Sequence, residues 1–211
     1  MDVTDTVHSY DIPWSYGGYD EPLTVQVLET EAATVLFGSG TAETAADLLD
    51  AIEDHDIDVV IVEHGDIDHY GGVPALRDAF DLEVAVPAGD ADFLAEADIE
   101  ADQLLEAGET YWGIETISVP GHTPDNMAYR YGEVLVAGDT VCGSDSPFCA
   151  EGDWPGKLAP LTAELNNDDS LTLRSIPTLL DYEFDVVLLT HGQNVLEDGY
   201  AEVEALVEAL E

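Results

Sequence analysis

Short apolar runs rich in β-branched residues recur along this chain, and segments with helical periodicity separate them. The runs are "LTVQVLE", "ATVLFG", "DVVIV", "LEVAV", "ETISV", "MAYRY", "EVLVA" and "DVVLL". Continuous runs of this kind are typical of strands that are buried on both faces. Helices are predicted at 45–52, in a short segment opened by Pro74, from about Asp90, at 168–181 with an interruption at Pro177, and at 203–210. Because strands and helices alternate without a linker or repeat, we expect one domain spanning residues 1–211.

Charge is the most unusual part of the composition. Four Lys and Arg residues stand against 47 Asp and Glu among 211 residues, a net charge of −43, and the acidic residues are spread along the whole chain. Such a chain repels itself in dilute buffer, whereas in molar salt the Debye length falls to about 3 Å and the repulsion is screened. We therefore expect a protein from a salt-adapted organism. Nucleic acid is not expected as a partner, because phosphate binding requires Lys and Arg.

The sequence also indicates where the protein works. The N-terminus has neither a basic region nor an apolar stretch, and no run approaches the roughly 18 apolar residues of a membrane helix. We expect a cytoplasmic protein without membrane association. Cys142 and Cys149 are too few for a disulfide scaffold and lack the spacing of a zinc ribbon, so reduced structural thiols are expected. Nothing in the sequence indicates an oligomeric state.

Potential metal ligands follow four of the predicted strands. His64 comes after "DVVIV", His122 after "ETISV", Asp139 after "EVLVA" and His191 after "DVVLL". If these strands lie side by side with their ends together, four loops deliver imidazole and carboxylate groups to one edge of the sheets. Rigid strands can hold ligand atoms at the fixed distances of about 2 Å that a cation requires. The pattern therefore predicts a metal site.

The stretch "HGDIDH" adds local support for this site. Residues 64, 66 and 68 alternate, so an extended loop would point all three the same way, and His69 would point to a neighbouring position. One short loop could therefore serve two metals. The two remaining histidines, His8 and His55, match no such pattern and are expected to be ordinary hydrogen-bonded loop residues.

Taken together, these motifs resemble those of the metallo-β-lactamase superfamily. "HGDIDHYGG" is similar to its first motif, His-x-His-x-Asp-His followed by a Gly pair. "VPGHTPDN", "VAGDTV" and "LLTHGQN" resemble the three later ligand segments, in the family's order. The resemblance extends from about Leu23 to the end of the chain.

The resemblance implies both a fold and a ligand set. The fold is of the α+β class, an αββα sandwich in which two mixed β-sheets pack face to face with helices on the outer faces. Carried over residue by residue, site one consists of His64, Asp66 in place of the usual second histidine, and His122. Site two consists of Asp68, His69 and His191, and Asp139 bridges the two metals.

Asp66 departs from the family pattern and leaves the metal open. A carboxylate is a harder ligand than imidazole and shifts preference from zinc toward iron or manganese. The flavodiiron branch of the family carries a glutamate at this place and binds two irons. Alternatively, Asp66 is too short to ligate, and His64, His122 and Asp139 hold a single iron, as in the family's persulfide dioxygenases. We favour two divalent ions, zinc or iron, with manganese as a further candidate.

The resemblance to glyoxalase II-like and lactonase members implies hydrolysis of a small ester or thioester by a metal-bound hydroxide. Asp68 would be the catalytic residue that holds the nucleophile and shuttles its proton. The alternative is a non-haem iron redox enzyme with a mono-iron or di-iron site. Either way the partner is a small-molecule substrate.

Several features bear on that substrate. Glyoxalase II has a C-terminal helical domain with basic residues for its glutathione thioester, for which 211 residues leave no room, so glutathione thioesters are not expected. "PWSYGGY" and "DSPFCAEGDWPGK" are candidates to line the pocket, although such Gly-rich aromatic loops also often merely cover a sheet edge. Lys157, the only lysine, is a candidate to meet a substrate carboxylate.

Overall fold

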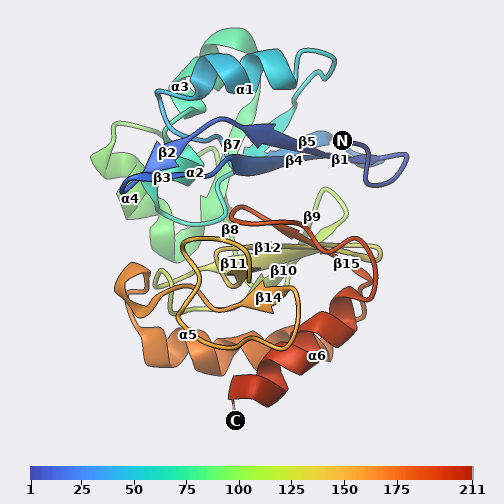
Figure 1. The fold of residues 1–211 in the computed structure, drawn as a ribbon. Helices are drawn as coiled ribbons and strands as arrows, with labels where there is room; N and C mark the ends of the chain where they lie inside the picture. Colours follow the sequence, from blue (N-terminus) through green and yellow to red (C-terminus); the bar gives the residue numbers. More distant parts are fainter. Residues whose placement is uncertain (211) are drawn as a thin grey trace.

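The computed structural model describes residues 1–210, which form two mixed β-sheets stacked face to face (Figure 1). The first sheet has six strands in the order β1-β4-β5-β6-β7-β8. Their bounds are β1 Val7–Ile12, β4 Leu23–Glu29, β5 Thr34–Phe37, β6 Val59–Ile61, β7 Glu83–Pro87 and β8 Gln103–Leu105. The pairs β1–β4 and β4–β5 are antiparallel, whereas β5 to β8 run parallel.

The second sheet has five strands in the order β15-β12-β11-β10-β9. Their bounds are β9 Thr110–Tyr111, β10 Ile114–Ser118, β11 Met127–Tyr131, β12 Val134–Gly138 and β15 Val186–Leu189. β10, β11 and β12 form an antiparallel meander, and β15 joins β12 in parallel. Two small hairpins, β2 (Ser15–Tyr16) with β3 (Tyr19–Asp20) and β13 (Cys142–Gly143) with β14 (Leu158–Ala159), lie outside the main sheets.

Helices cover both outer faces of this stack. α1 (Ala45–Ala51), α3 (Val73–Ala79) and α4 (Ala91–Glu96) belong to the first half of the chain, and α1 and α3 lie over the first sheet (Figure 1). α5 (Asp169–Ser175), the 3₁₀ segment η3 (Ile176–Asp181) and α6 (Gly199–Leu210) cover the second sheet. The short helix α2 (Ile67–Tyr70) and the 3₁₀ turns η1 (Ala88–Asp90) and η2 (Ala163–Leu165) lie in connections.

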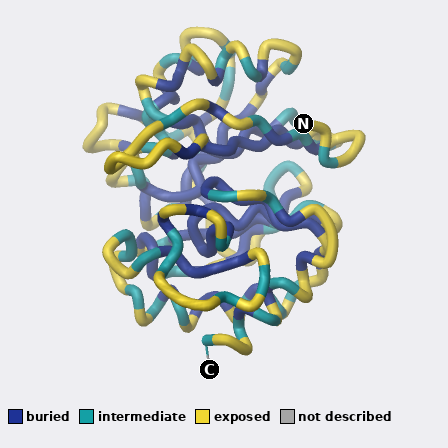
Figure 2. The backbone as a smooth tube through the Cα atoms, viewed as in Figure 1, coloured by how far each residue is buried: buried dark blue, intermediate teal, exposed yellow. Residues whose placement is uncertain are grey.

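Burial on both faces explains the continuous apolar runs. In β6, Val59 and Ile61 point into the core between the sheets, whereas Val60 points into the core beneath the first layer of helices. The second sheet does the same, because Val136 faces the inner core and Leu135 faces the core under α5 and α6. Burial is accordingly highest along the central strands and lowest at the outer loops (Figure 2). The predicted αββα sandwich is confirmed.

Some local expectations were incomplete. β1 was not predicted, because polar residues interrupt the run "VHSYDI". No helix or strand is predicted between the run "EVLVA" and residue 160, yet this segment contains both β13 and β14. The helix predicted at 168–181 ends its α-helical part at Ser175, one residue earlier than Pro177 suggests, and continues as the 3₁₀ segment η3. No helix in residues 1–210 combines the length and the apolar character needed to cross a membrane.

Candidate metal centre

Four strands end at one shared edge of the two sheets, and each is followed by a predicted ligand. β6 ends at Ile61 ahead of His64, and β10 ends at Ser118 ahead of His122. β12 and β15 lie in parallel, so the residues that follow them, Asp139 and His191, leave the second sheet on the same side. Because β10 is antiparallel to β11 and β11 is antiparallel to β12, β10 shares that direction.

One group of ligand-type atoms comes from His64, Asp66 and His122. The Nε2 atoms of His64 and His122 are 3.2 Å apart. Asp66 Oδ2 lies 3.1 Å from His122 Nε2 and 3.8 Å from His64 Nε2. Both histidines are buried, whereas the Asp66 side chain is 48% exposed. The three atoms therefore face one point from three sides, with Asp66 on the open side.

A second group consists of Asp68, His69 and His191. Asp68 Oδ2 lies 3.4 Å from His191 Nε2 and 4.0 Å from His69 Nε2. Both ring atoms are buried, and the Asp68 side chain is 15% exposed. This group therefore also combines two buried imidazoles with one carboxylate that reaches toward the surface.

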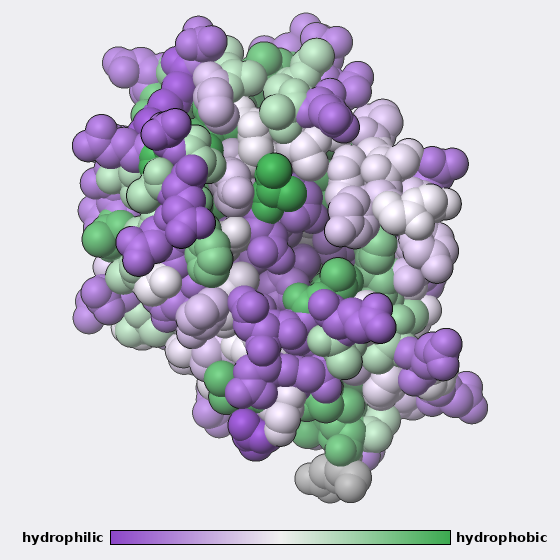
Figure 3. Space-filling view, turned by 90° about the vertical axis from the view of Figure 1, so that its left-hand side faces the viewer, coloured by the Kyte–Doolittle hydropathy of each residue, from purple (hydrophilic) through white to green (hydrophobic). Residues whose placement is uncertain are grey.

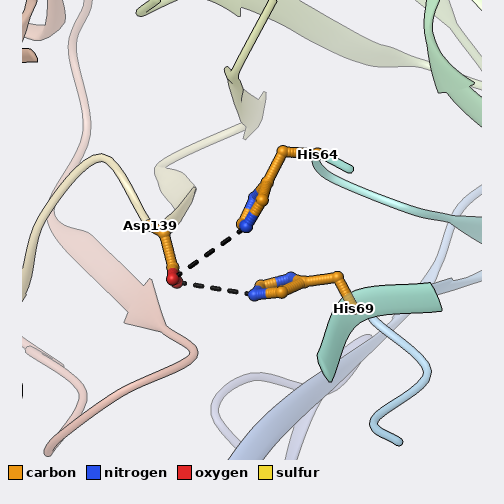
Figure 4. Close-up of side chains that lie close together, drawn as sticks. All are labelled: His64, His69 and Asp139. Atoms are coloured by element: carbon orange, nitrogen blue, oxygen red, sulfur yellow. Dashed lines mark ion pairs between the residues drawn. The ribbon is translucent and has the colours of Figure 1, made fainter. Parts of the chain in front are cut away.

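Asp139 lies between the two groups. Its Oδ2 is 3.6 Å from His122 Nε2 and 3.5 Å from His191 Nε2, and its Oδ1 is 3.6 Å from His69 Nε2. His64 and His69 point toward this carboxylate from the first half of the chain, and Asp139 reaches them from the end of β12 (Figure 4). One carboxylate thus contacts ligand atoms of both groups.

The spacing of these atoms fits metal ions. Two ligand atoms that each lie about 2.1 Å from one ion at the tetrahedral angle are about 3.4 Å apart. The distances of 3.1, 3.2 and 3.8 Å in the first group are close to this value. Moreover, His69 Nε2 and Asp139 Oδ1 are buried and have no hydrogen-bond partner within residues 1–210. Buried polar atoms without a partner are costly, so a pair that faces a common point suits a cation.

The charges of the centre are strongly coupled. Burial alone would lower the pKa of His69, yet the Glu63 and Asp139 carboxylates outweigh it and raise that pKa well above its usual range. For His191, burial is likewise outweighed, mainly by Asp139, and the pKa is raised. Burial and the neighbouring histidines instead hold the pKa of His64 well below its usual range. Asp139, which would face a cation, therefore also favours the protonated forms of His69 and His191.

Three of the histidine rings have an oxygen atom near Nδ1, on the side away from the centre. The buried Glu63 Oε2 is 3.0 Å from His69 Nδ1, and Asn166 Oδ1 is 3.2 Å from His122 Nδ1. Glu21 Oε2 lies 3.7 Å from His191 Nδ1, beyond hydrogen-bond distance, so that contact is electrostatic. An oxygen on the Nδ1 side leaves Nε2 free to face the centre, which is how proteins orient metal-binding histidines.

Asp90 ties two ligand loops to each other. It is fully buried at the end of η1 and accepts hydrogen bonds from the backbone N–H groups of Gly65 and Asp125, both at 3.1 Å, and from the Thr123 hydroxyl. Gly65 adjoins His64, and Thr123 follows the histidine at 122. Burial raises the pKa of Asp90, although these hydrogen bonds oppose the shift.

Sequence reasoning missed Glu63, Asp90, Asn166 and Glu21. A signal existed for two of them. Asp90 follows the strand "LEVAV", so the strand-end rule that found the ligands applies to it as well. Glu63 directly extends the apolar run "DVVIV", where a charged residue is unusual without a partner. Asn166 and Glu21 lie in irregular segments, and the sequence offers no comparable signal for them.

The extended-loop expectation for residues 64–68 is wrong. Asp66 has extended backbone angles, φ −96° and ψ 149°, but α2 begins directly after it at Ile67. The helical turn directs Asp68 toward His69 and His191 instead of toward the first group. The loop still supplies both groups, although it does so through a change from extended to helical backbone.

His8 and His55 lie apart from the centre. His8 Nδ1 is 2.8 Å from Asp2 Oδ1, and His55 Nε2 is 2.7 Å from the Tyr10 hydroxyl. Both are hydrogen-bonded, as expected, although His8 lies on β1 and not in a loop. Cys142 and Cys149 are free thiols, in agreement with the prediction.

A pocket of about 500 Å³ opens over the two groups. Its floor includes Asp66, Asp68, His122, Asp139 and His191. On the face that carries the β2–β3 hairpin and α2, a hollow with a hydrophilic floor lies between hydrophobic side chains (Figure 3). Both candidate segments contribute to the lining, Trp14, Ser15 and Tyr16 from "PWSYGGY" and Phe148 from "DSPFCAEGDWPGK".

No Lys or Arg among residues 1–210 lines this pocket. Lys157, a candidate for contact with a substrate carboxylate, is exposed in a separate hollow beside Ser144 and Asp145, which corrects that expectation. Arg77 and Arg130 form salt bridges with Asp102 and Glu115, at 2.6 and 2.9 Å. Arg174 is hydrogen-bonded to Ser170 on α5. All four Lys and Arg residues of the chain lie within residues 1–210 and away from the pocket lining.

The fold and the convergent His and Asp side chains define a class of αββα proteins with a candidate metal-binding centre at one edge of the sheets. Comparison with protein families identifies the class more closely. The chain belongs to the metallo-beta-lactamase superfamily, whose model matches residues 22–191.

Two curated relatives support this membership. Hydroxyacylglutathione hydrolase from Cereibacter sphaeroides is 31% identical over 163 residues, which cover 68% of this chain and 63% of the relative. The enzyme of the same name from Methylobacillus flagellatus is 27% identical over 134 residues, covering 64% of this chain and 53% of the relative. The chain therefore spans between half and two thirds of the length of these curated relatives.

Solved structures confirm the fold over the whole chain. A metallo-beta-lactamase from Pontibacter korlensis superposes with a TM-score of 0.73 at 18% identity, covering 100% of this chain and 97% of the other. An archaeal metallo-beta-lactamase superfamily protein from Sulfolobus tokodaii gives 0.68 at 21% identity, covering 97% and 85%. At such identities the likeness concerns the fold alone.

Proposed function

We propose that this chain is a metal-dependent hydrolase of a small ester or thioester. The observation that carries the proposal is the convergence of seven His and Asp side chains, five of which line an open pocket. The similarity to hydroxyacylglutathione hydrolases, which are named for hydrolysis of a glutathione thioester, supports the same reaction class.

Two divalent ions fit the two ligand groups. His64, Asp66 and His122 would hold the first ion, and Asp68, His69 and His191 the second, with Asp139 between them. When bound, such ions polarise a carbonyl group and lower the pKa of a water toward about 7. Zinc and iron are the leading candidates and manganese is a third, because imidazole and carboxylate ligands suit all of them.

Asp68 is the proposed catalytic residue. Its carboxylate lines the pocket, and its Oδ2 lies 3.4 Å from His191 Nε2 within the second ligand group, so one oxygen would bind the ion and the other would be left for a water. In this position Asp68 holds the attacking water, accepts its proton and returns that proton to the leaving thiol or alcohol. General base catalysis of this kind contributes about 100-fold or more to a rate.

A non-haem iron redox enzyme is the second candidate. The observation that favours it is the carboxylate at Asp66, which suits iron better than the imidazole it replaces. His64, His122 and Asp139 also approach one another within 4.0 Å, as a two-histidine, one-carboxylate iron site requires. A thiol or persulfide would then be the substrate, with oxygen as co-substrate.

Metal analysis and activity together separate the two. The protein is purified in molar salt without added metal, and its metal identity and stoichiometry are determined. Hydrolysis of a thioester panel is then compared with oxygen uptake in the presence of a persulfide. We expect two equivalents of metal and thioester hydrolysis. One equivalent of iron with oxygen uptake would refute the hydrolase proposal.

Variants connect the activity to the site. Asp68→Ala should lower kcat for thioester hydrolysis by about 100-fold. Asp78→Ala, which removes an exposed carboxylate from α3, is the matched control and should match the parent. Hydrolysis by Asp68→Ala at the parental rate would overturn the proposed role of this residue.

We further propose that the protein works in a salt-rich cytoplasm. The support is the net charge of −43 and its spread along the chain. Because like charges at this density repel one another unless they are screened, the folded state is suited to high ionic strength.

A further inference from the structure

An aromatic wall, formed by Trp14, Tyr16 and Phe148, stands beside the metal centre. Trp14 and Tyr16 are stacked, with ring centres 5.4 Å apart and 8° between their planes, and Phe148 lies 5.9 Å from Trp14. The rings of Phe148 and Trp14 also approach the ring of His191, at 5.1 and 5.8 Å. The aromatic wall therefore begins at a proposed metal ligand and extends to the outside of the pocket.

Two distant segments build the aromatic wall. Trp14 and Tyr16 belong to the β2–β3 hairpin region, whereas Phe148 lies in the connection between β13 and β14. The Phe148 backbone is fixed on both sides, because its N–H donates to Ser146 Oγ at 3.1 Å and its carbonyl accepts from the Thr162 N–H at 2.9 Å. Phe148 is 7% exposed and Tyr16 is 56% exposed. The wall thus has a fixed inner part and an open outer part.

Outside the candidate metal centre, the described lining of the pocket offers no positive charge. Besides the centre itself, the one further charged residue of the lining is Glu43, which is exposed and acidic, within residues 1–210. Asp66, Asp68 and Asp139 would offset most of the charge of two divalent ions. An anionic group that lies away from the scissile bond would therefore meet carboxylates and aromatic rings but no cation. A desolvated charge without a partner is strongly unfavourable.

We infer that the site takes an ester or thioester without negative charge, whose apolar or aromatic part packs on Trp14 and Phe148. This inference rests on the proposed hydrolase function. Neutral and cationic substrates share the required chemistry, because aromatic faces accept both apolar groups and cations. Glutathione thioesters, which carry carboxylates, fit this pocket poorly even though curated relatives are named for them.

The reaction itself is a simple hydrolysis. The oxygen of water forms a bond to the carbonyl carbon, the carbon–sulfur or carbon–oxygen bond breaks, and the leaving group takes up a proton. The products are a carboxylic acid and a thiol or alcohol. Neither an oxidant nor a reductant is required.

A matched substrate panel tests the inference. Phenylacetyl thioesters of N-acetylcysteamine, thiocholine and glutathione share one acyl group but carry a neutral, a cationic and an anionic thiol. We expect kcat/KM for the neutral and cationic members to exceed that for the glutathione thioester by at least about tenfold, at the lowest salt that keeps the protein folded. Non-hydrolysable phenacyl thioethers of N-acetylcysteamine and glutathione, compared by calorimetry, should show the same order of Kd without turnover.

Variants test the two parts of the pocket separately. Trp14→Ala and Phe148→Ala should each raise KM for the phenylacetyl substrate by about tenfold and affect the acetyl analogue less. Tyr200→Ala on α6 is the control, because it removes a partly exposed aromatic ring that does not line the pocket. Glu43→Lys should raise the ratio of kcat/KM for the glutathione thioester over the neutral thioester several-fold.

The outcomes distinguish this inference from the proposed function. Hydrolysis of the panel with equal or greater kcat/KM for the glutathione thioester would overturn the inference and leave the hydrolase function in place. If no member is hydrolysed faster by the metal-loaded parent than by Asp68→Ala, the proposed function fails and the inference fails with it. Equal Kd for the two thioethers would also contradict the inference, independently of any rate.

Discussion

Glu63 should control how tightly the second metal is bound. Its side chain is 1% exposed and its Oε2 lies 3.0 Å from Nδ1 of His69, on the side of the ring away from the centre. Gly38 and Gly138, both with positive φ, pack beside Glu63, and a Cβ at either would be in ordinary van der Waals contact with it, at 3.4 or 3.5 Å. The substitution Glu63→Gln keeps the shape of this side chain and removes its charge.

The expected magnitude follows from this single contact. A hydrogen bond to a carboxylate is roughly twice as strong as one to a neutral oxygen, and loss of such an outer partner lowers metal affinity by about 10- to 100-fold. Gln can still accept from Nδ1, so Glu63→Gln should fall near the lower end, about tenfold or 1.4 kcal/mol. Glu63→Ala should fall near the upper end, because the ring then loses its partner and a cavity remains.

Chelator competition on the metal-loaded protein measures this effect. The two equivalents are followed as separate steps, and in Glu63→Gln we expect only the step of the second ion, the one at His69, to weaken. Glu83→Gln is the control, since Glu83 is exposed at the start of β7 and its replacement removes the same charge. A purely structural role would lower the Tm of the metal-free protein without a selective loss of the second equivalent. Parental affinity for both equivalents would refute the reasoning.

Two further predictions concern the whole protein. The metal-free protein should lose unfolding free energy as pH rises from about 6.5 through the raised pKa values of His69, His122 and His191, because a group whose pKa is raised by folding stabilises the fold only while it is protonated. Chemical denaturation at a series of pH values checks this, and a metal-free stability that climbs over that range would contradict it. Separately, Tm should rise by roughly 10 °C between 0.1 and 2 M KCl, a few kcal/mol for a chain of this size. Thermal unfolding at constant pH measures the change, and a Tm that does not respond to salt would argue against adaptation to a salt-rich cytoplasm.

The candidate ligands at the strand ends could be located from sequence because the topology is simple at that edge. A strand that is buried on both faces has a continuous apolar sequence, and the first polar residues after it must lie where the strand leaves the sheet. His64, Asp139 and His191 each satisfy this rule, and the parallel course of β12 and β15 places the last two together. The same rule identifies Asp90 after β7, so this residue could also have been predicted from the sequence.

Other parts of the site depend on contacts that local sequence does not encode. The pairing of Glu63 with His69 arises because α2 turns the chain back toward the end of β6. Asn166 reaches His122 from 44 residues further along the chain. Lys157 was expected at the pocket but lies in a separate hollow. This placement likewise depends on how the β13–β14 connection folds. Periodicity indicates which face of an element is buried but not which distant side chain meets it.

The geometry of Asp66 changes the argument about the metal. Its Oδ2 lies 3.1 Å from His122 Nε2, close to the spacing of two ligands on one ion, so the carboxylate is long enough to reach the first group. The course of the backbone brings Asp66 to this position. Gly65 packs so closely against Phe93 that a Cβ would lie 2.2 Å from the ring, and Asp66 then leads directly into α2. A single-iron site based on a short Asp66 therefore loses its main support. The preference for zinc or iron would then follow from the charge and hardness of three carboxylates, which would supply oxygen ligands to the proposed pair of ions.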